Sequence, residues 1–177
     1  MLEGWESAPA DSPGAAIVVS VHFRPYTPAD FATLYAIEEL CFEPPERFSR
    51  GYMRHRLDSS DSATWIAEEN GKMAGFAIVV WSSQCEGQGS ETNERAAYLE
   101  TIELAPQWRR RGAARELLRL CEQSAIAAGA RCIWLHVEAG NLAAQSLYES
   151  AGFTRRGREE NYYPRGRAAL VYGKTMP

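Results

Sequence analysis

From residue 96 onward the sequence alternates between strand-like and helix-like hydrophobic patterns, and this alternation constrains the fold more than any other feature. The strand-like segments are short apolar runs, and the helix-like segments repeat apolar residues three and four positions apart. A strand, a helix and a strand in succession form a crossover that packs helices on a mostly buried sheet. We expect strands at 96–104, 131–139, 153–161 and 167–176, and helices at 112–129 and 141–152.

The preceding residues predict a strand, two helices and a hairpin. A β-rich run ends at Pro25, and a helix with Thr27 as its cap follows. The dipeptide Asn70-Gly71 between two strand-like runs is a strong signal for an antiparallel hairpin. Residues 82–95 have no periodic hydrophobic pattern, which predicts a long mobile loop. The expected elements are a strand at 16–26, helices at 27–42 and 48–57, and strands at 63–69 and 72–81.

Length and composition fit a single domain. A chain of 177 residues with 45% hydrophobic residues fills one core and not comfortably two. Residues 1–16 are rich in Ala, Pro, Gly and Ser, which predicts a disordered leader before a domain at 17–177. The leader is acidic where a signal peptide would be basic, and the apolar run at 15–19 is too short to span a membrane. We therefore expect a cytoplasmic protein that is not inserted in a membrane.

The charge balance argues against a general nucleic-acid partner. The chain has 23 acidic and 19 basic residues, with a formal net charge of −4, so it lacks a broad electropositive surface. Any anion site must therefore be local. The four cysteines form no Cys-x-x-Cys pair and have no histidine at metal-ligand spacing, so no metal is expected.

Three consecutive arginines stand between a predicted strand and a predicted helix. Pro106 ends the strand and the helix begins near Gly112, so the turn presents backbone N–H groups where the helix dipole favours an anion. Gly112 removes a side chain that would block close approach, and the arginines supply charge-assisted bonds. A solvated turn can have the same pattern, which lacks the glycines and lysine of a P-loop or a dinucleotide fingerprint. The candidate phosphate-binding residues are Arg109, Arg110, Arg111, Gly112, Ala113, Ala114 and Arg115.

This turn resembles the Arg/Gln-x-x-Gly-x-Gly/Ala motif of the Gcn5-related N-acetyltransferases, with Arg109, Gly112 and Ala114 at its defined positions. The similarity extends over about 20–175, nearly the whole chain. Three later segments, WLHVEAGN, NLAAQSLYESAGF and REENYYP, resemble the ribosomal-protein-alanine N-acetyltransferase (RimI) branch and its eukaryotic N-terminal acetyltransferase relatives. The resemblance implies an α/β (α+β) fold: a mixed, mostly antiparallel twisted sheet of six to seven strands, about four helices, and a central parallel unit of strand 96–104, helix 112–129 and strand 131–139.

The same resemblance implies acetyl-CoA (coenzyme A) as cofactor and a primary amine as acceptor. Its RimI-like part favours the N-terminal α-amine of a protein or peptide, for instance a ribosomal protein, and a monomer or weak dimer. Acetyl transfer requires a neutral amine, a stabilised oxyanion and a proton for the departing thiolate. An α-amino group, with a pKa of about 8, loses its proton more easily than a lysine, with a pKa of about 10.4. A modest base therefore suffices for an N-terminal substrate.

His136 and Tyr98 are the leading candidates for the base. Alternate residues of strand 131–139 form an unbroken apolar face, and His136 lies on the opposite face toward the C-terminal end of the strand. The resemblance to certain eukaryotic enzymes implies that such a histidine works with a tyrosine through an ordered water, whereas the bacterial RimI pattern has a glutamate here. Glu100, on the same strand face as Tyr98, is the competing base. A structural histidine and a solvated carboxylate are the alternatives.

Tyr148 is the candidate acid, although a helical tyrosine can also be a core residue. It lies two turns into a helix that begins after Asn141, and the resemblance implies that it donates a proton to the coenzyme A thiolate. Tyr162 and Tyr163, expected in a loop between the last two strands, and Phe42 are implied to hold the acceptor. The backbone of 102–104 is implied to contact the oxyanion and the pantetheine. The remaining cofactor candidates are Ile102, Glu103, Leu104 and Asn141.

Three other functions remain open from the sequence. The acceptor can instead be a polyamine, an amino acid or a drug-like amine. A second alternative is a non-catalytic acyl-CoA-binding domain, against which Tyr148 and His136 argue. Nucleic-acid binding through 109–119 is the third, and the overall acidity of the chain argues against it.

Overall fold

A computed structural model describes residues 21–82 and 95–177. The predicted leader 1–16, the first part of the predicted strand 16–26 and the interior of the predicted loop 82–95 lie outside the described residues. The elements in chain order are β1 (His22–Pro25), a 3-10 turn (Pro28–Asp30), α1 (Phe31–Cys41), α2 (Arg50–Leu57), β2 (Ser62–Glu69), β3 (Lys72–Ser82), β4 (Ala96–Leu104), a 3-10 turn (Pro106–Trp108), α3 (Ala113–Ala127), β5 (Cys132–Glu138), α4 (Leu142–Ser150), β6 (Thr154–Tyr163), a 3-10 turn (Pro164–Gly166) and β7 (Arg167–Thr175).

The strands form a seven-stranded sheet in the order β1-β2-β3-β4-β5-β7-β6. Among the described strands, β4 and β5 pair in parallel and all other neighbours pair antiparallel, which confirms the predicted mixed, mostly antiparallel sheet. The crossover through α3 joins two adjacent strands, as predicted. The crossover through α4 does not, because β7 lies between β5 and β6.

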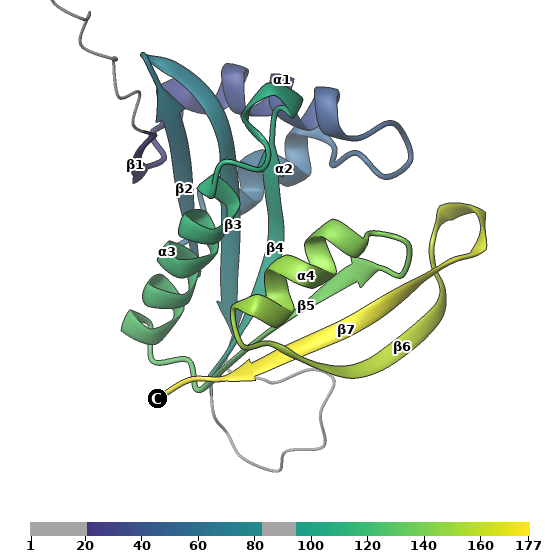
Figure 1. Cartoon of the computed structure of the whole chain (residues 1–177). Coiled ribbons are helices and arrows are strands. Elements are labelled where there is room, and N and C mark those ends of the chain that lie inside the picture. The colour runs from purple at the N-terminus through teal and green to yellow at the C-terminus, as the bar shows by residue number, and fades with distance from the viewer. Residues whose placement is uncertain (1–20, 83–94) are drawn as a thin grey trace, which may run out of the picture.

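Helices cover both faces of the sheet (Figure 1): α1 and α2 lie on one face, and α3 and α4 on the other. Alternation along β3 explains this, since successive side chains of a strand point to opposite faces. Phe76 and Ile78 pack in the cluster of α1 and α2, and Ala77 and Val79 pack in the cluster of α3. None of the helices in the described ranges is both long and apolar enough to cross a membrane.

The sheet is split between β4 and β5. Their ladder joins only Ala96, Ala97 and Tyr98 to the first three residues of β5. Beyond Tyr98 the two strands diverge, and β5, β7 and β6 run off at an angle to the first four strands (Figure 1).

One predicted boundary is wrong. The strand expected to end at Asn161 continues to Tyr163, which pairs with Arg167 of β7. Asn161 has a positive φ of 57°, and the register shifts between Glu159 and Tyr163. An asparagine in this left-handed conformation is typical of a turn, but here it lies within an irregular strand. Tyr162 and Tyr163 are therefore on the end of β6 and not in a loop.

Candidate active site

A cavity of about 830 Å³ lies at the split between β4 and β5, and its volume is in the usual range for small-molecule sites. Its lining comes from both faces of the sheet. Tyr98 and His136 lie on the α2 side, whereas Tyr148 belongs to the core cluster of α3. The sequence-predicted residues that line this cavity are Phe42, Tyr98, Glu100, Ile102, His136, Asn141, Tyr148, Tyr162 and Tyr163.

Tyr98 and His136 are in direct contact. The Tyr98 hydroxyl lies 3.2 Å from Nδ1 of His136, which is hydrogen-bonding distance. The strand pairing produces this contact, since Tyr98 is opposite Trp134 in the parallel ladder and His136 is the next residue on that face of β5. Burial raises the pKa of Tyr98 well above its usual range, and the neighbouring Tyr162 adds to the shift. Tyr98 therefore stays a neutral hydroxyl at neutral pH.

His136 is enclosed by aromatic rings. Its side chain is only 8% exposed, its ring stacks on Tyr162 with 4.1 Å between centroids, and Trp134 meets it edge-on at 5.4 Å. On its other side, Nε2 lies 3.2 Å from Oε1 of Glu159. Sequence reasoning missed Glu159, because nothing in the pattern of β6 indicates which side chain of β5 it reaches.

Glu100 is engaged with α2 instead of standing free in the cavity. The Tyr52 hydroxyl donates a hydrogen bond to Oε1 of Glu100, and Arg56 forms an ion pair at 3.5 Å with Oε2. The β3–β4 register skips at this point, because Thr101 is opposite Ile78 and Leu99 is opposite Val79. Glu100 is thus the extra residue of a bulge, and its side chain is 6% exposed. No sequence pattern indicates these two partners on α2.

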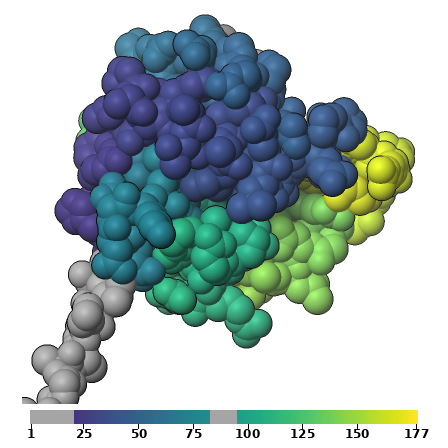
Figure 2. All heavy atoms as spheres, turned by 90° about the horizontal axis from the view of Figure 1, so that it is seen from above, coloured from purple at the N-terminus to yellow at the C-terminus, as the bar shows by residue number. Residues whose placement is uncertain are grey.

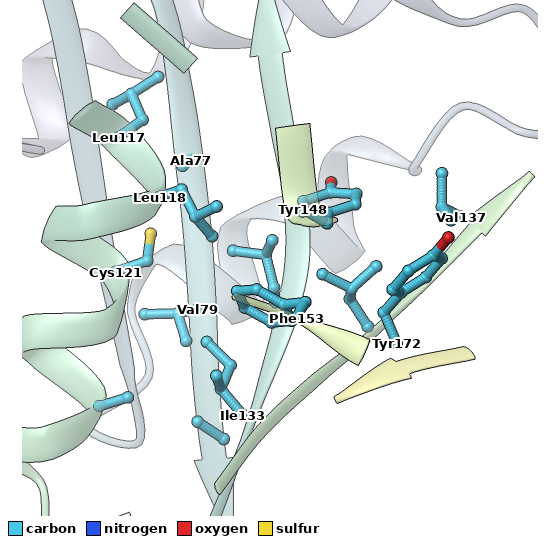
Figure 3. Close-up of a cluster of buried hydrophobic side chains, with 14 of the residues drawn as sticks. Ala77, Val79, Leu117, Leu118, Cys121, Ile133, Val137, Tyr148, Phe153 and Tyr172 are labelled. Carbon is cyan, nitrogen blue, oxygen red and sulfur yellow. The ribbon is translucent and has the colours of Figure 1, made fainter. Parts of the chain in front are cut away.

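Tyr148 projects from α4 into the other side of the cavity. Asn141 caps this helix as predicted, since its side-chain oxygen accepts from Ala144 N at 3.1 Å. The Tyr148 ring packs in the core with Phe153 and Tyr172, at centroid distances of 5.8 and 6.3 Å (Figure 3). Burial raises the pKa of Tyr148 above its usual value. The hydroxyl therefore keeps its proton at neutral pH.

Phe42, Tyr162 and Tyr163 border the cavity from two distant segments, and we call these three residues the acceptor wall. Figure 2 shows the two segments meeting, with the blue residues after α1 next to the yellow hairpin end where β6 leads into β7. Arg167 joins them: it forms ion pairs with Glu46, after α1, and with Glu138, at the end of β5, the latter at 2.5 Å.

The arginine turn lies at the start of α3 and borders a second cavity of about 390 Å³. Gly112 is the N-cap of α3 with a φ of 85°, and no side chain in the described residues caps this helix. A Cβ at Gly112 would meet nothing within 4 Å, so the glycine is required by its left-handed backbone and not by steric crowding in this structure. Ala113 and Arg111 border the same cavity, and Ala114, partly buried, is one residue further on.

The arginines of the turn mainly contact the protein. Arg109 donates through Nε to the Leu104 carbonyl at 2.8 Å, and Arg111 pairs with Glu69 at 3.3 Å. Arg115 donates to Ser150 Oγ at 2.9 Å, which ties α3 to α4. Arg110 is exposed and has a positive φ of 64°.

The last residues of β4 separate into a cavity side and a buried side. Ile102 lines the cavity, whereas Glu103 is buried on the side of α1. The Glu103 carboxyl accepts from Thr101 Oγ1 at 2.9 Å, and burial, together with the neighbouring Glu38, raises its pKa well above the usual range. The Glu103 side chain therefore points away from the cavity. Only the backbone of Glu103 is on the cavity side of the strand.

Residues 31–153 match the model of the acetyltransferase (GNAT) family, and this span is more than half of the chain. The chain belongs to the GNAT acetyltransferase family. This membership confirms the resemblance that the arginine turn and the later segments indicated, and it makes the protein an acyltransferase. The family match ends at Phe153, so β6, which carries Glu159 and two residues of the acceptor wall, and β7 lie beyond it.

Curated GNAT relatives differ in their acceptors. The ribosomal protein bS18-alanine N-acetyltransferase of Escherichia coli is 36% identical over 96 residues, which cover 54% of this chain and 57% of that enzyme. The chain thus spans little more than half the length of this relative. Streptothricin acetyltransferase of Streptomyces lavendulae is 34% identical over 137 residues, covering 73% of this chain and 68% of that enzyme.

Solved GNAT structures share the fold over most of the chain. NAA60 of Arabidopsis thaliana, in complex with acetyl-CoA, superposes with a TM-score of 0.78 at 21% identity, covering 89% of this chain and 99% of that one. The ribosomal-protein-S18-alanine N-acetyltransferase of Escherichia coli superposes with a TM-score of 0.72 at 26% identity, covering 89% and 96%.

Proposed function

We propose that the protein is an acetyl-CoA-dependent N-acetyltransferase that acts on the N-terminal α-amine of a protein or peptide. The observation that carries the proposal is the contact between Tyr98 and His136 in a cavity that also holds Tyr148 and the acceptor wall. The relatives named for alanine N-acetylation of a ribosomal protein support this acceptor class. A cytoplasmic site of action, where ribosomal proteins are made, is part of the proposal.

The residues present fit acetyl-CoA. The uncapped start of α3, with Gly112 in a left-handed conformation, leaves backbone N–H groups of 112–114 for a pyrophosphate, and Arg110 is exposed beside them. Arg109 and Arg111 hold the turn against β4 and β2, so they act mainly by shaping it. When bound, acetyl-CoA supplies an acetyl group activated as a thioester.

The base in this proposal is His136, with Tyr98 as relay. A general base must lie within hydrogen-bonding reach of the proton that it receives, directly or through one group. Tyr98 remains a neutral hydroxyl because burial raises its pKa, so the proton it takes from the acceptor amine is matched by one it donates to His136 Nδ1. Glu100 is a poorer candidate, since Tyr52 donates to its Oε1 and the positive charge of Arg56, 3.5 Å from its Oε2, favours the ionised carboxylate, although Oε2 itself accepts no hydrogen bond from the described residues.

The acid is Tyr148. It lies on the opposite face of the sheet from the Tyr98–His136 pair, so the two proton transfers take place on opposite sides of the reacting atoms. Its raised pKa keeps the Oη proton available for the thiolate leaving group. The acceptor wall then closes on the backbone of an extended peptide, which offers more surface than a small amine.

The test is thiol release from acetyl-CoA by the purified protein. Peptides beginning with Ala, Ser or Met are compared with the same peptides blocked at the N-terminus and carrying an internal lysine. Turnover with free α-amines alone is the expected result. Equal turnover of the blocked, lysine-containing peptides contradicts the proposed acceptor.

A small-molecule amine is the second candidate acceptor, and the similarity to streptothricin acetyltransferase over 73% of this chain favours it. Streptothricin and a polyamine are therefore added to the acceptor panel. Turnover of these compounds with no turnover of peptides moves the assignment to small amines. Binding of acetyl-CoA with no turnover of any acceptor indicates a non-catalytic acyl-CoA-binding domain.

A further inference from the structure

Both ring nitrogens of His136 have a partner. Nδ1 lies 3.2 Å from the Tyr98 hydroxyl, and Nε2 lies 3.2 Å from Oε1 of Glu159. An ionised carboxylate only accepts hydrogen bonds, so it selects the neutral imidazole that carries its proton on Nε2. Nδ1 is then left with its lone pair directed at the Tyr98 hydroxyl, which can donate to it.

We propose that Glu159, on the edge strand β6, fixes His136 in this tautomer and orients Nδ1 as the proton acceptor of the site. The proposal rests on the proposed function for its catalytic meaning. Glu159 is a positioning residue, because it acts through His136 and does not line the cavity.

The strand order brings the two side chains together. β7 lies between β5 and β6: Val171 is opposite both His136 and Gly157, and the next residue on that face, Ala169, is opposite Glu159. Two inter-strand spacings, about 9–10 Å, separate β5 from β6, a gap that a histidine and a glutamate reaching toward each other bridge. The small side chain of Ala169 leaves the path between them open.

The packing around His136 holds the ring in place for this contact. Tyr162 stacks on it, Trp134 meets it edge-on, and Tyr98 lies at its Nδ1 edge. The titratable groups that face the ring are Tyr98 from β4 and Glu159 and Tyr162 from β6. Glu138, further along β5, is paired with Arg167, so its charge is matched elsewhere.

The proton movements balance. The acceptor ammonium gives one proton to Tyr98 Oη, and the original Oη proton passes to His136 Nδ1. The amine becomes neutral, Tyr98 is unchanged, and His136 becomes a cation with a proton on each nitrogen. The Nε2 proton stays on His136, and the charge of Glu159 offsets the new positive charge.

Three variants separate the effect of the Glu159 charge from the effect of its hydrogen-bond acceptor. Glu159→Gln keeps an oxygen that accepts from Nε2 but removes the charge, and Glu159→Ala removes both. Glu160→Gln is the matched control, because Glu160 is the next residue, is exposed, and pairs with Arg158 and not with His136. Both sites are on the exposed edge strand, and thermal unfolding checks that each of the three variants folds.

The first readout is imidazole ¹⁵N NMR, which reports the tautomer and the Nε2–H proton without any turnover. The chain has three histidines, so His136 is assigned by its loss in His136→Ala. The expected result is a slowly exchanging Nε2–H in the native protein, Glu160→Gln and Glu159→Gln. In Glu159→Ala, fast exchange and a measurable Nδ1–H fraction are expected. A Glu159→Ala spectrum that matches the native one overturns the proposal.

The second readout is kinetic. Glu159→Ala is expected to lower kcat/KM about tenfold through kcat, less than the roughly 10²–10⁴-fold contribution of a general base, with an unchanged KM for acetyl-CoA. Glu159→Gln, which keeps an acceptor for Nε2, is expected to lose less of kcat than Glu159→Ala. Kinetics of Glu159→Ala equal to those of Glu160→Gln overturn the proposal. If Glu159→Ala changes the tautomer but the native protein turns over no peptide, the positioning role of Glu159 is supported and the proposed function is contradicted.

Discussion

The Tyr52 hydroxyl donates a hydrogen bond to Oε1 of Glu100, which links α2 to the bulge of β4 inside the cavity. Together with Arg56, it engages a carboxylate that would otherwise be the natural base of this strand. The structure thus contains two candidate bases, one already bonded to cationic and hydroxyl partners and one facing a tyrosine hydroxyl. Substituting His136 and Glu100 one at a time shows which of them is the base.

His136→Ala is therefore expected to be far more damaging than Glu100→Gln. Loss of the base lowers kcat/KM by about 10²–10⁴-fold, whereas Glu100→Gln, which still accepts from Tyr52, costs less than about tenfold. Initial rates with a free N-terminal peptide measure both. A Glu100→Gln enzyme as inactive as His136→Ala assigns the base role to Glu100.

Tyr148→Phe removes the proposed acid while keeping the ring that packs with Phe153 and Tyr172. We expect kcat to fall by about 10²-fold or more, with an unchanged dissociation constant for coenzyme A. Tyr172→Phe is the matched control, because its hydroxyl bonds to Glu149 at 2.7 Å and does not line the cavity. It should lose about 1 kcal/mol of stability and keep its kcat. Equal kcat values for the two variants rule out Tyr148 as the acid.

The raised pKa of Glu103 predicts that the protein loses stability as the pH rises. Burial and Glu38 raise its folded-state pKa, so between the unfolded value, about 4.3, and the folded value only the native protein holds the proton. Stability is therefore highest below that window and falls by up to about 1.4 kcal/mol per pH unit across it. Glu103→Gln should be stabilised relative to the native protein as the pH rises.

Urea unfolding at pH 5, 7 and 9 measures this difference. Glu39→Gln is the control, since Glu39 is next to Glu38 on α1 but its side chain is 47% exposed. A native-to-Glu103→Gln difference that does not change with pH contradicts a raised pKa for Glu103.

Gly75→Ala is expected to destabilise the protein by about 1–3 kcal/mol, because overpacking forces the backbone to shift. A Cβ at Gly75 would lie 2.1 Å from the Glu103 carbonyl oxygen on β4. Gly51→Ala, in α2, meets nothing within 4 Å and should stabilise by about 0.5–1 kcal/mol through helix propensity. Chemical denaturation compares the pair, and an unchanged midpoint for Gly75→Ala shows that the strands separate there at no cost.

Several elements could be predicted because their patterns are local. The helix α3 shows an apolar stripe, and β5 shows strict alternation with Ile133, Leu135 and Val137 buried, so both were predicted within a few residues. The position of β7 between β5 and β6 has no such local sign, because the pairing of antiparallel strands depends on contacts across the chain. Asn161 was mistaken for a strand end for a similar reason, since the ladder to β7 overrides its preference for a turn.

The candidate site divides in the same way. The pairing of Tyr98 with His136 was implied by the family resemblance, and the parallel ladder between two strands that the sequence pattern identified places the two side chains in contact. The contact of Glu159 with His136 depends on the position of β7, and the contact of Tyr52 with Glu100 depends on the packing of α2 on β4. The hydrophobic periodicity of the sequence predicts neither arrangement. Chemistry on neighbouring strands could therefore be predicted, and the residues that tune it could not.

The short ladder between β4 and β5 has a consequence for self-association. Strand edges usually lie at the outside of a sheet, where they recruit other chains unless charge or twist prevents it. After Tyr98, one side of β4 is such an edge placed inside the molecule, while β6, one of the two outer strands, carries a dense row of arginines and glutamates. The fold thereby keeps a stretch of β4 edge in its interior, beside the cavity, and presents a charged strand at one outer edge.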